Sequence, residues 1–299
     1  MIRFRPVLAL LLLGLLSAHA ADPSRPAVRG PDLLIHPWQE GGWKGQLPGD
    51  WKIEGPEKSE VTPHMGGTLT LKNVSDPALA YFAPDKKAAP SGKGVIICPG
   101  GGYNILAWDL EGTEVATFLS SLGHHAWVLK YRLPRQGQDT VRHLPALEDA
   151  QRSLSLLRSQ AASIGLNPGQ LGIKGFSAGG HLSALTATAG NDRAYPARDA
   201  IDQVSCRPDF CALIYPAYLF KDDKSPGLIP GPGSPPAFLS HSADDGLTYR
   251  NSSHFFDALQ SHKIRSELHL WPDGGHGYGM RSPVTPKAWP ALFAAWLAE

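Results

Sequence analysis

Six short apolar segments are spaced along the chain, and stretches with helical periodicity separate them. They predict buried strands at 94–98, 126–131, 170–174, 210–215, 236–241 and 266–271. A helix over 146–164 is predicted because apolar residues recur there every three or four positions: Leu147, Ala150, Leu154, Leu157, Ala161 and Ile164. The C-terminal residues Ala288, Trp289, Leu292, Phe293 and Trp296 follow the same period. Apolar strands that alternate with amphipathic helices indicate an α/β protein with a mostly parallel central sheet and helices on both faces.

The segment Gly175-Phe176-Ser177-Ala178-Gly179 joins a predicted strand to a helical run. It has the G-x-S-x-G form of a nucleophile elbow, in which a sharp turn raises a serine above the edge of the sheet. Side chains two residues before and after the serine would collide, so glycine is required at both places. The helix behind Ser177 would direct its N-terminal N–H groups at an anion forming there. His181 is expected to pack behind the elbow.

Three glycines follow the strand at 94–98, in the segment Cys98-Pro99-Gly100-Gly101-Gly102-Tyr103. Glycines let the backbone approach a substrate closely, and backbone N–H groups are the usual donors to the oxyanion of acyl transfer. Together with the N–H of Ala178, which follows the candidate nucleophile, they would form an oxyanion hole. A phosphate-binding P-loop is excluded because the glycines are not followed by Lys-Ser or Lys-Thr.

An acid and a histidine follow the last two predicted strands. Asp244 and Asp245 come after the strand at 236–241, and His276 stands in the glycine-rich loop after the strand at 266–271. A carboxylate at a strand end can hold a histidine in its useful tautomer, and a histidine among glycines can reach a serine. Either aspartate could serve, and the order along the chain is serine, aspartate, histidine.

These motifs resemble the α/β-hydrolase esterases, in particular the acetyl-xylan-esterase-like branch. The resemblance rests on the segments 95–103, 129–134, 149–152, 175–182 and 274–277. It implies Ser177 as nucleophile, His276 as base, Asp245 as acid, and Gly101, Gly102 and Ala178 as oxyanion donors. Two departures stand out: Pro99 occupies the place of a histidine in lipase-like relatives, and Gly246-Leu247-Thr248 follows Asp245 where relatives continue to Val-Pro.

The N-terminus predicts export of the protein. Arg3 and Arg5 precede an apolar run from Val7 to Leu16, and Ala18-His19-Ala20 has the form of a cleavage site. Residues 1–20 are therefore expected to be a signal peptide, with an uncleaved anchor as the alternative. The remainder would be secreted or periplasmic, with no membrane association after cleavage. The formal net charge of +1 gives no reason to expect a nucleic-acid partner.

Residues 21–90 differ in composition from the predicted catalytic domain at 91–299, because they are rich in Pro, Gly and charge. They are expected to form an extension packed on the core. Segments 68–71 and 78–82 could be leading antiparallel strands of the same sheet. The tryptophans Trp38, Trp43 and Trp51 either form a sugar-stacking surface or pack the extension onto the core.

Few further residues suggest chemistry. Tyr103, Asn104 and Trp108 follow the glycine loop and are candidates for substrate contacts. Cys206 and Cys211 could form a disulfide if the chain turns at Pro208. No metal-site spacing occurs in the sequence, and no cofactor is expected.

The sequence thus predicts a secreted serine esterase that acts through an acyl-enzyme. By resemblance, its substrates are short-chain esters, especially acetyl esters, on plant polysaccharides or their fragments. A feruloyl or general short-chain carboxylesterase is the alternative among enzymes. A catalytically silent binding protein with the hydrolase fold is the alternative outside enzymes.

Overall fold

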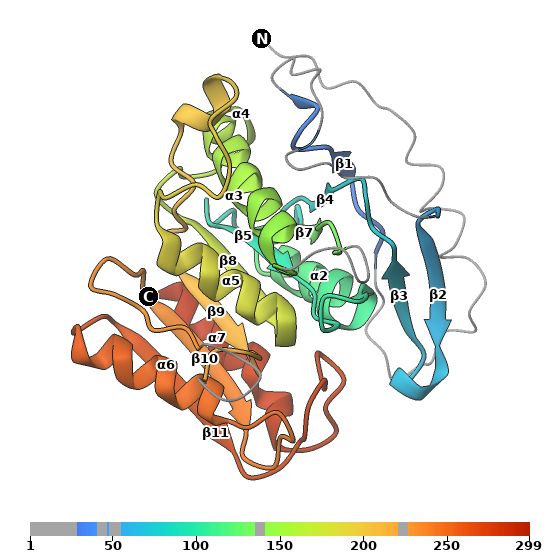
Figure 1. Cartoon of the computed structure of the whole chain (residues 1–299), viewed down its shortest axis with the longest axis vertical. Helices are drawn as coiled ribbons and strands as arrows, with labels where there is room; N and C mark the ends of the chain where they lie inside the picture. The colour runs from blue at the N-terminus through green and yellow to red at the C-terminus, as the bar shows by residue number, and fades with distance from the viewer. Residues whose placement is uncertain (1–28, 41–46, 48–54, 135–140, 221–226) are drawn as a thin grey trace.

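The computed structural model describes residues 29–40, 47, 55–134, 141–220 and 227–299 (Figure 1). The predicted signal peptide, Trp43 and Trp51 lie outside these residues. No helix within the described ranges has the length and apolar character needed to cross a membrane.

An eight-stranded sheet forms the centre of the molecule, in the order β1-β4-β7-β5-β8-β9-β10-β11. Its strands are β1 (Leu33–Ile35), β4 (Ala78–Phe82), β5 (Gly94–Cys98), β7 (His125–Lys130), β8 (Leu171–Phe176), β9 (Cys211–Ile214), β10 (Ala237–Ser242) and β11 (Ser266–Trp271). The strands from β7 to β11 run parallel, whereas β1 and β4 pair antiparallel at one edge. Each of the six predicted strands is present, with ends that differ by at most a few residues.

Helices cover the sheet, and their apolar residues form the core with the buried strands. They are α2 (Glu114–Ser121), α3 (Leu144–Ser159), α4 (Ala161–Ile164), α5 (Ser177–Ala189), α6 (Arg250–Ser261) and α7 (Trp289–Ala298). In Figure 1, α3, α5 and α6 lie in front of the sheet and α7 lies behind it. The predicted helix at 146–164 is divided into α3 and α4 at Gln160. The short helical turns are η2 (Pro63–Met65), η3 (Asp109–Thr113), η4 (Ala200–Gln203) and η5 (Thr285–Ala288).

A second, smaller sheet consists of β2 (Lys58–Thr62), β3 (Thr68–Lys72) and β6 (Leu106–Ala107). The expectation that both 68–71 and 78–82 extend the main sheet was therefore only half right. Strand β4 pairs with β7, but β3 pairs with β2 and with β6 from the loop after β5. The cause is that Leu106 and Leu71 are both buried at this pairing, so the loop after the glycines supplies the partner of β3.

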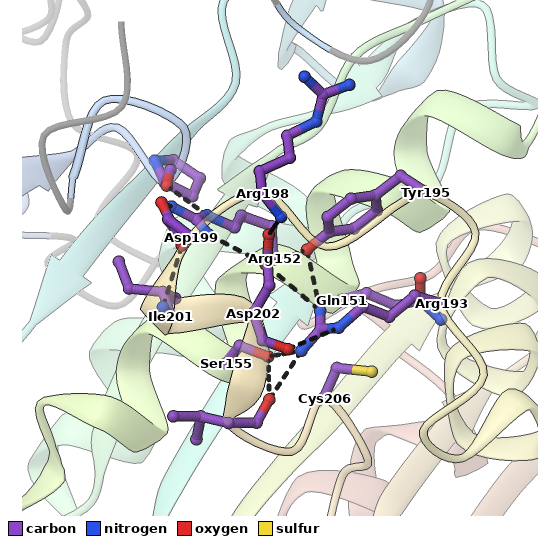
Figure 2. Close-up of polar contacts among 12 residues, drawn as sticks. Gln151, Arg152, Ser155, Arg193, Tyr195, Arg198, Asp199, Ile201, Asp202 and Cys206 are labelled. Atoms are coloured by element: carbon purple, nitrogen blue, oxygen red, sulfur yellow. Dashed lines mark hydrogen bonds and ion pairs between the residues drawn. The ribbon is translucent and has the colours of Figure 1, made fainter. Parts of the chain in front are cut away.

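Arg152 of α3 attaches the loop at 190–204 through ion pairs and the N-terminal segment through hydrogen bonds (Figure 2). Arg152 of α3 pairs with Asp199 at 2.6 Å and with Asp202 at 2.9 Å, and it donates to the carbonyl oxygen of Pro37. We call these residues and their neighbours the arginine cluster. Its members are Trp38, Arg132, Glu148, Asp149, Arg152, Asp199 and Asp202.

Trp38 lies at the centre of the arginine cluster. The guanidinium carbons of Arg132 and Arg152 lie 5.7 and 5.6 Å from its ring centroid. Its indole N–H donates to Asp149, which also accepts from Arg132. Trp38 is almost fully buried, so it packs the N-terminal segment onto the core and offers no sugar-stacking surface.

The three cysteines are buried and free. Cys206 donates to the carbonyl oxygen of Gly190, while Cys211 begins β9, and the disulfide that the sequence left open between them is not formed.

Candidate active site

Strand register brings the predicted catalytic loops to one edge of the main sheet. Strands β5 and β8 are neighbours, and Cys98 is paired with Gly175, so the glycine loop and the elbow leave the sheet at the same level. Strands β10 and β11 are paired from Ala237 and Ser266 to Ser242 and Trp271. The loops that carry the acid and the histidine therefore also start together, at the carboxyl ends of the parallel strands.

The side chains of Ser177, His276 and Asp245 form a continuous hydrogen-bonded chain. His276 Nε2 lies 2.8 Å from Ser177 Oγ, and His276 Nδ1 lies 2.7 Å from Asp245 Oδ2. Ser177 and Asp245 are buried, while His276 is partly exposed. The three side chains thus have the mutual geometry of a serine–histidine–aspartate triad.

The protonation of this chain follows from the carboxylate. Burial by itself would raise the pKa of Asp245, but hydrogen bonds from His241 and His276 outweigh burial and hold the pKa well below its ordinary range. Asp245 is therefore ionised and can only accept, so His276 Nδ1 must donate to it. In the neutral imidazole, Nε2 then has a free lone pair directed at the hydroxyl of Ser177.

The elbow has the strained backbone that its sequence predicts. Ser177 has a φ of +50°, which is rare for a residue with a side chain. A Cβ on Gly175 would lie 2.0 Å from the carbonyl oxygen of Gly179, and one on Gly179 would lie 2.1 Å from that of Cys98. Both glycines are thus required by close backbone contacts around the serine.

The glycine loop packs directly against the nucleophile. A Cβ on Gly100 would lie 2.8 Å from Cβ of Ser177, so the loop approaches the serine as closely as backbone can. Tyr131 fixes the start of the loop by donating to the carbonyl oxygen of Pro99 at 2.6 Å. The N–H groups of Gly101 and Gly102 have no acceptor among the described residues. Ala178 lies in the first turn of α5, where helical N–H groups have no partner within the helix.

The two adjacent aspartates have different contacts. Asp245 is buried against His276, whereas Asp244 is exposed and accepts a hydrogen bond from the backbone N–H of Gly275 at 2.8 Å. The sequence left open which of the two aspartates faces His276. In the structure, Asp245 is its partner. Asp244 anchors the loop that carries His276.

The three candidate substrate contacts lie in different surroundings. Trp108 and Tyr103 are buried in the hydrophobic core, and the hydroxyl of Tyr103 lies 2.9 Å from Nδ1 of His181. Only Asn104 is exposed, and it accepts a hydrogen bond from Arg142. His181 is buried against this loop, and burial, followed by the effect of His143, lowers its pKa to about 3.

Sequence reasoning missed a buried carboxylate behind the glycine loop. Glu111 lies in η3, a π-helical turn, and accepts from the N–H of Gly100 at 2.7 Å and from the hydroxyl of Tyr215 at 2.8 Å. Tyr215 in turn accepts from the N–H of Gly279, in the loop that carries His276. Burial raises the pKa of Glu111, while these hydrogen bonds oppose that rise. Glu111 and Tyr215 thus join the glycine loop to the loop that carries His276.

A lysine lies beneath these groups without a hydrogen-bond partner among the described residues. Lys174 of β8 is fully buried, and its Nζ lies 4.1 Å from the ring centroid of Phe176 and 4.0 Å from that of Trp289. Burial lowers the pKa of Lys174 far below its usual value, although the charge of Glu111 opposes this. The surroundings therefore favour a neutral amine.

A second missed residue, His241, contacts Asp245 from β10 at 2.9 Å. We refer to Glu111, Ser177, Tyr215, His241, Asp245 and His276 together as the active-site cluster. The signal for His241 in the sequence was a histidine four residues before the acid, within a strand that is otherwise buried. Such a polar side chain needs a partner.

Comparisons with known proteins show what the chain is similar to. A family model described as BD-FAE matches residues 79–206, which include the glycine loop and the elbow. The chain is 28% identical over 239 residues to an acetylxylan esterase of Xylanibacter ruminicola, covering 71% of this chain and 46% of that protein. It is 28% identical over 217 residues to endo-1,4-beta-xylanase B of Butyrivibrio fibrisolvens, covering 65% of this chain and 34% of that protein. The chain thus spans less than half the length of these curated relatives.

A solved structure covers more of the chain. The acetyl ester-xyloside bifunctional hydrolase from Caldicellulosiruptor lactoaceticus superposes with a TM-score of 0.70 and 28% sequence identity, over 91% of this chain and 98% of that one. Together with the mostly parallel sheet and the site at its carboxyl edge, this assigns the chain to the α/β-hydrolase fold, and within that fold the chain is similar to the acetyl-xylan-esterase-like esterases.

Proposed function

We propose that this protein is a serine carboxylic-ester hydrolase that removes short acyl groups, acetyl foremost, from plant polysaccharides or oligosaccharides. The observation that carries the proposal is the hydrogen-bonded chain from Ser177 through His276 to Asp245. The names of two relatives, an acetylxylan esterase and an acetyl ester-xyloside hydrolase, support acetyl esters of xylan as the substrate class.

The first half of the reaction forms the acyl-enzyme. His276 Nε2 takes the proton of Ser177 as Oγ attacks the ester carbonyl carbon, and Asp245 stabilises the imidazolium that results. The carbonyl oxygen becomes an oxyanion, which we assign to the N–H groups of Gly101, Gly102 and Ala178. The bond to the alcohol oxygen then breaks, and that oxygen receives the proton from His276.

The second half of the reaction releases the acid. Water loses a proton to His276 and attacks the acyl carbon, and a second oxyanion forms at the same N–H groups. The bond to Ser177 Oγ breaks, and His276 returns the proton to the serine. The cycle needs neither a metal nor a cofactor, because each proton moves between Ser177, His276, water and the two products.

The site of action belongs to the proposal as well. An exported enzyme would meet plant polysaccharides outside the cytoplasm, and the charged, apolar and small-residue order of residues 1–20 supports export. The folded protein would then be secreted or periplasmic.

Acetate release across a panel of esters tests the proposal. Acetylated xylan, acetylated xylo-oligosaccharides, acetylated pectin, methyl ferulate and p-nitrophenyl acetate would each be incubated with the purified wild-type protein and with Ser177→Ala. We expect acetate from xylan and its fragments with the wild type, and none above background with the variant. Release of ferulate without acetate would mean that the enzyme removes feruloyl groups and not acetyl groups. No hydrolysis of any ester by the folded wild type would contradict it.

A further inference from the structure

His241 is a buried histidine in direct contact with the acid of the triad. It is the fifth residue of β10, and its side chain is fully buried. Its Nε2 lies 2.9 Å from Oδ2 of Asp245, and its Nδ1 lies 2.8 Å from Oγ of Ser252 on α6. The imidazole therefore spans from the acid to the neighbouring helix with both nitrogens in contact.

The proton positions follow from the chemistry of these partners. Asp245 is an ionised acceptor, so Nε2 of His241 must carry a hydrogen and donate it. Burial lowers the pKa of His241, although its hydrogen bond with Asp245 opposes this, so the ring is neutral. Its Nδ1 then has only a lone pair, which accepts the hydroxyl hydrogen of Ser252. Ser252 thereby fixes the tautomer that Asp245 requires.

Two imidazoles meet at one carboxylate oxygen. Oδ2 of Asp245 contacts Nδ1 of His276 at 2.7 Å and Nε2 of His241 at 2.9 Å. The other oxygen, Oδ1, accepts from the backbone N–H of Leu247 at 2.7 Å. A second donor on the oxygen that faces His276 fixes the direction of the carboxylate. It also withdraws part of the negative charge that would otherwise act on His276.

We propose that His241 is a positioning residue for the ester hydrolysis proposed above, which orients Asp245 and weakens its hold on the proton of His276. A base must be neutral to accept a proton from serine and must then retain that proton only briefly. If Asp245 had no second donor, it would stabilise the imidazolium more strongly, and His276 would release its proton less readily. His241 thus extends the range of pH over which the triad is active toward the acid side.

Other charged and titratable groups around this unit are few. The charges that act on His241 are those of Asp245 and His276. Glu111 acts on His276 across the site, and the ring of Tyr215 lies 5.0 Å from the imidazole of His276. Because these groups are unchanged in a His241 variant, they affect the pH profiles of the wild type and the variant equally.

Tyr278 is also close enough to be affected by the charge of Asp245. From β11, Leu270 is paired with His241 in the sheet and contributes no titratable group. From α6, Ser252 is the polar contact. The acid side of the activity profile is therefore governed by Asp245, His241 and Glu111 acting on one imidazole.

A pair of variants separates the donor from the shape of the side chain. Gln at position 241 can place an N–H near the position of Nε2, whereas Met has a similar volume and no donor. For His241→Met we expect a loss of about 10–10²-fold in kcat with KM within about threefold, because a hydrogen bond to a charged group is removed. The acid midpoint of the kcat/KM profile should rise by about half to one pH unit. His241→Gln should keep the wild-type midpoint and lie within about fivefold of the wild-type rate.

Several results would overturn the proposal. One is a wild-type rate and midpoint in folded His241→Met. Another is an equal loss in the Met and Gln variants with no movement of the midpoint, which would mean that the imidazole only fills space. If His241→Met does not fold, Ser252→Ala replaces it in the test. This variant keeps His241 but removes the hydroxyl that donates to Nδ1, so the tautomer with the hydrogen on Nε2 is no longer fixed. It should lower kcat by about two- to fivefold and raise the midpoint, and an unchanged profile would count against His241.

Phosphonylation of Ser177 distinguishes this inference from the proposed function. A fluorophosphonate reacts when Oγ attacks phosphorus and fluoride leaves, with His276 accepting the serine proton, so no ester substrate is needed. If the wild type reacts with the probe but hydrolyses no ester, the proposed function fails, and the His241 variants are compared by the rate and pH midpoint of phosphonylation. A folded wild type that reacts with neither would overturn both.

Discussion

The arginine cluster and the active-site cluster both bury carboxylates, but different groups surround those carboxylates. In the arginine cluster, Asp149 and Glu148 pair with Arg132. Asp199 and Asp202 pair with Arg152 (Figure 2). In the active-site cluster, Asp245 and Glu111 accept only from neutral donors and from His276 among the described residues. These donors are backbone N–H groups, the Tyr215 hydroxyl and His241.

This difference separates a structural use of charge from a chemical one. A guanidinium compensates a buried carboxylate permanently, so the arginine cluster holds the N-terminal segment and the loop at 190–204 in place and has no charge left for a reaction. Neutral donors keep a carboxylate ionised without cancelling its charge. The negative charge of Asp245 therefore remains available when His276 becomes positive. Lys174, beneath the site, is desolvated among aromatic rings, which favours its neutral amine, so it does not cancel the charge of either carboxylate.

Removing the charge of Asp245 should have the largest effect on the rate. Asp245→Asn should lower kcat by about 10³–10⁴-fold, because the imidazole of His276 loses both its orientation and the partner of its positive charge. Asp244→Asn, the matched control, should lose less than about tenfold, since Asp244 contacts only a backbone N–H. Steady-state kinetics on p-nitrophenyl acetate measure both. Equal losses in the two variants would remove the distinction between these aspartates.

Removing a cation from the arginine cluster should affect stability and leave the rate intact. Arg152→Met removes the cation of Asp199 and the nearer of the two cations of Asp202, which keeps Arg193 at 3.5 Å, and should lower the free energy of unfolding by about 3–5 kcal/mol. Arg265→Met breaks the exposed pair with Glu299 and should cost at most about 1 kcal/mol. Urea unfolding measures both. A tenfold fall in kcat for folded Arg152→Met would show that the two clusters are coupled.

The same substitution can be placed in the active-site cluster, at Tyr215, and beside the arginine cluster, at Tyr195, which donates to Asp202. Tyr215→Phe leaves Glu111 and the N–H of Gly279 unpaired, so the oxyanion and histidine loops lose their connection, and kcat should fall about 10–10²-fold. Tyr195→Phe removes the hydroxyl that donates to Asp202 and should cost about 1–2 kcal/mol of stability with kcat unchanged. Kinetics and urea unfolding on both variants provide the test. A loss of rate in Tyr195→Phe and a loss of stability alone in Tyr215→Phe would contradict the catalytic role of Tyr215 and the structural role of Tyr195.

Acid should destabilise the active-site side through His181. Burial is the main cause that lowers its pKa to about 3 in the folded protein. Between about pH 6.5 and pH 3, His181 is therefore protonated in the unfolded chain and neutral in the folded protein. The resulting stability is complete above pH 6.5 and is lost as the pH falls toward 3. His181→Asn should reduce the difference in unfolding free energy between pH 7 and pH 5 by about 1–2 kcal/mol. An identical pH dependence in wild type and variant would show that the pKa of His181 is the same in the folded and unfolded states, and would contradict the prediction.

The sequence predicted those parts of the molecule that depend on local pattern. The six parallel strands follow from short apolar runs, and the elbow follows from the two glycines around Ser177. Even the order of serine, acid and histidine could be read, since each residue lies in the turn or loop that follows its strand. Whether Asp244 or Asp245 faces the histidine could not be read, because that choice depends on how the chain turns after β10.

The residues that were missed act through contacts between distant segments. Glu111 and Tyr215 are 104 residues apart and meet only because β5, β8 and β9 are neighbours in the sheet. A lone glutamate after a glycine-rich loop resembles a solvated charge, so only the fold shows that it is buried. The burial of Tyr103 and Trp108 could not be read for a related reason: the sequence shows that they follow the glycine loop, but not the turn that directs them into the core.

The central claim is that an acyl group is carried on Ser177 during turnover. Its most direct test is acid quenching of the protein during hydrolysis of p-nitrophenyl acetate, followed by mass analysis of the peptides. The account predicts a single acetyl group on the peptide that contains Ser177, and neither adduct nor turnover in folded Ser177→Ala. An acetyl group on another residue with turnover retained in Ser177→Ala would contradict the account.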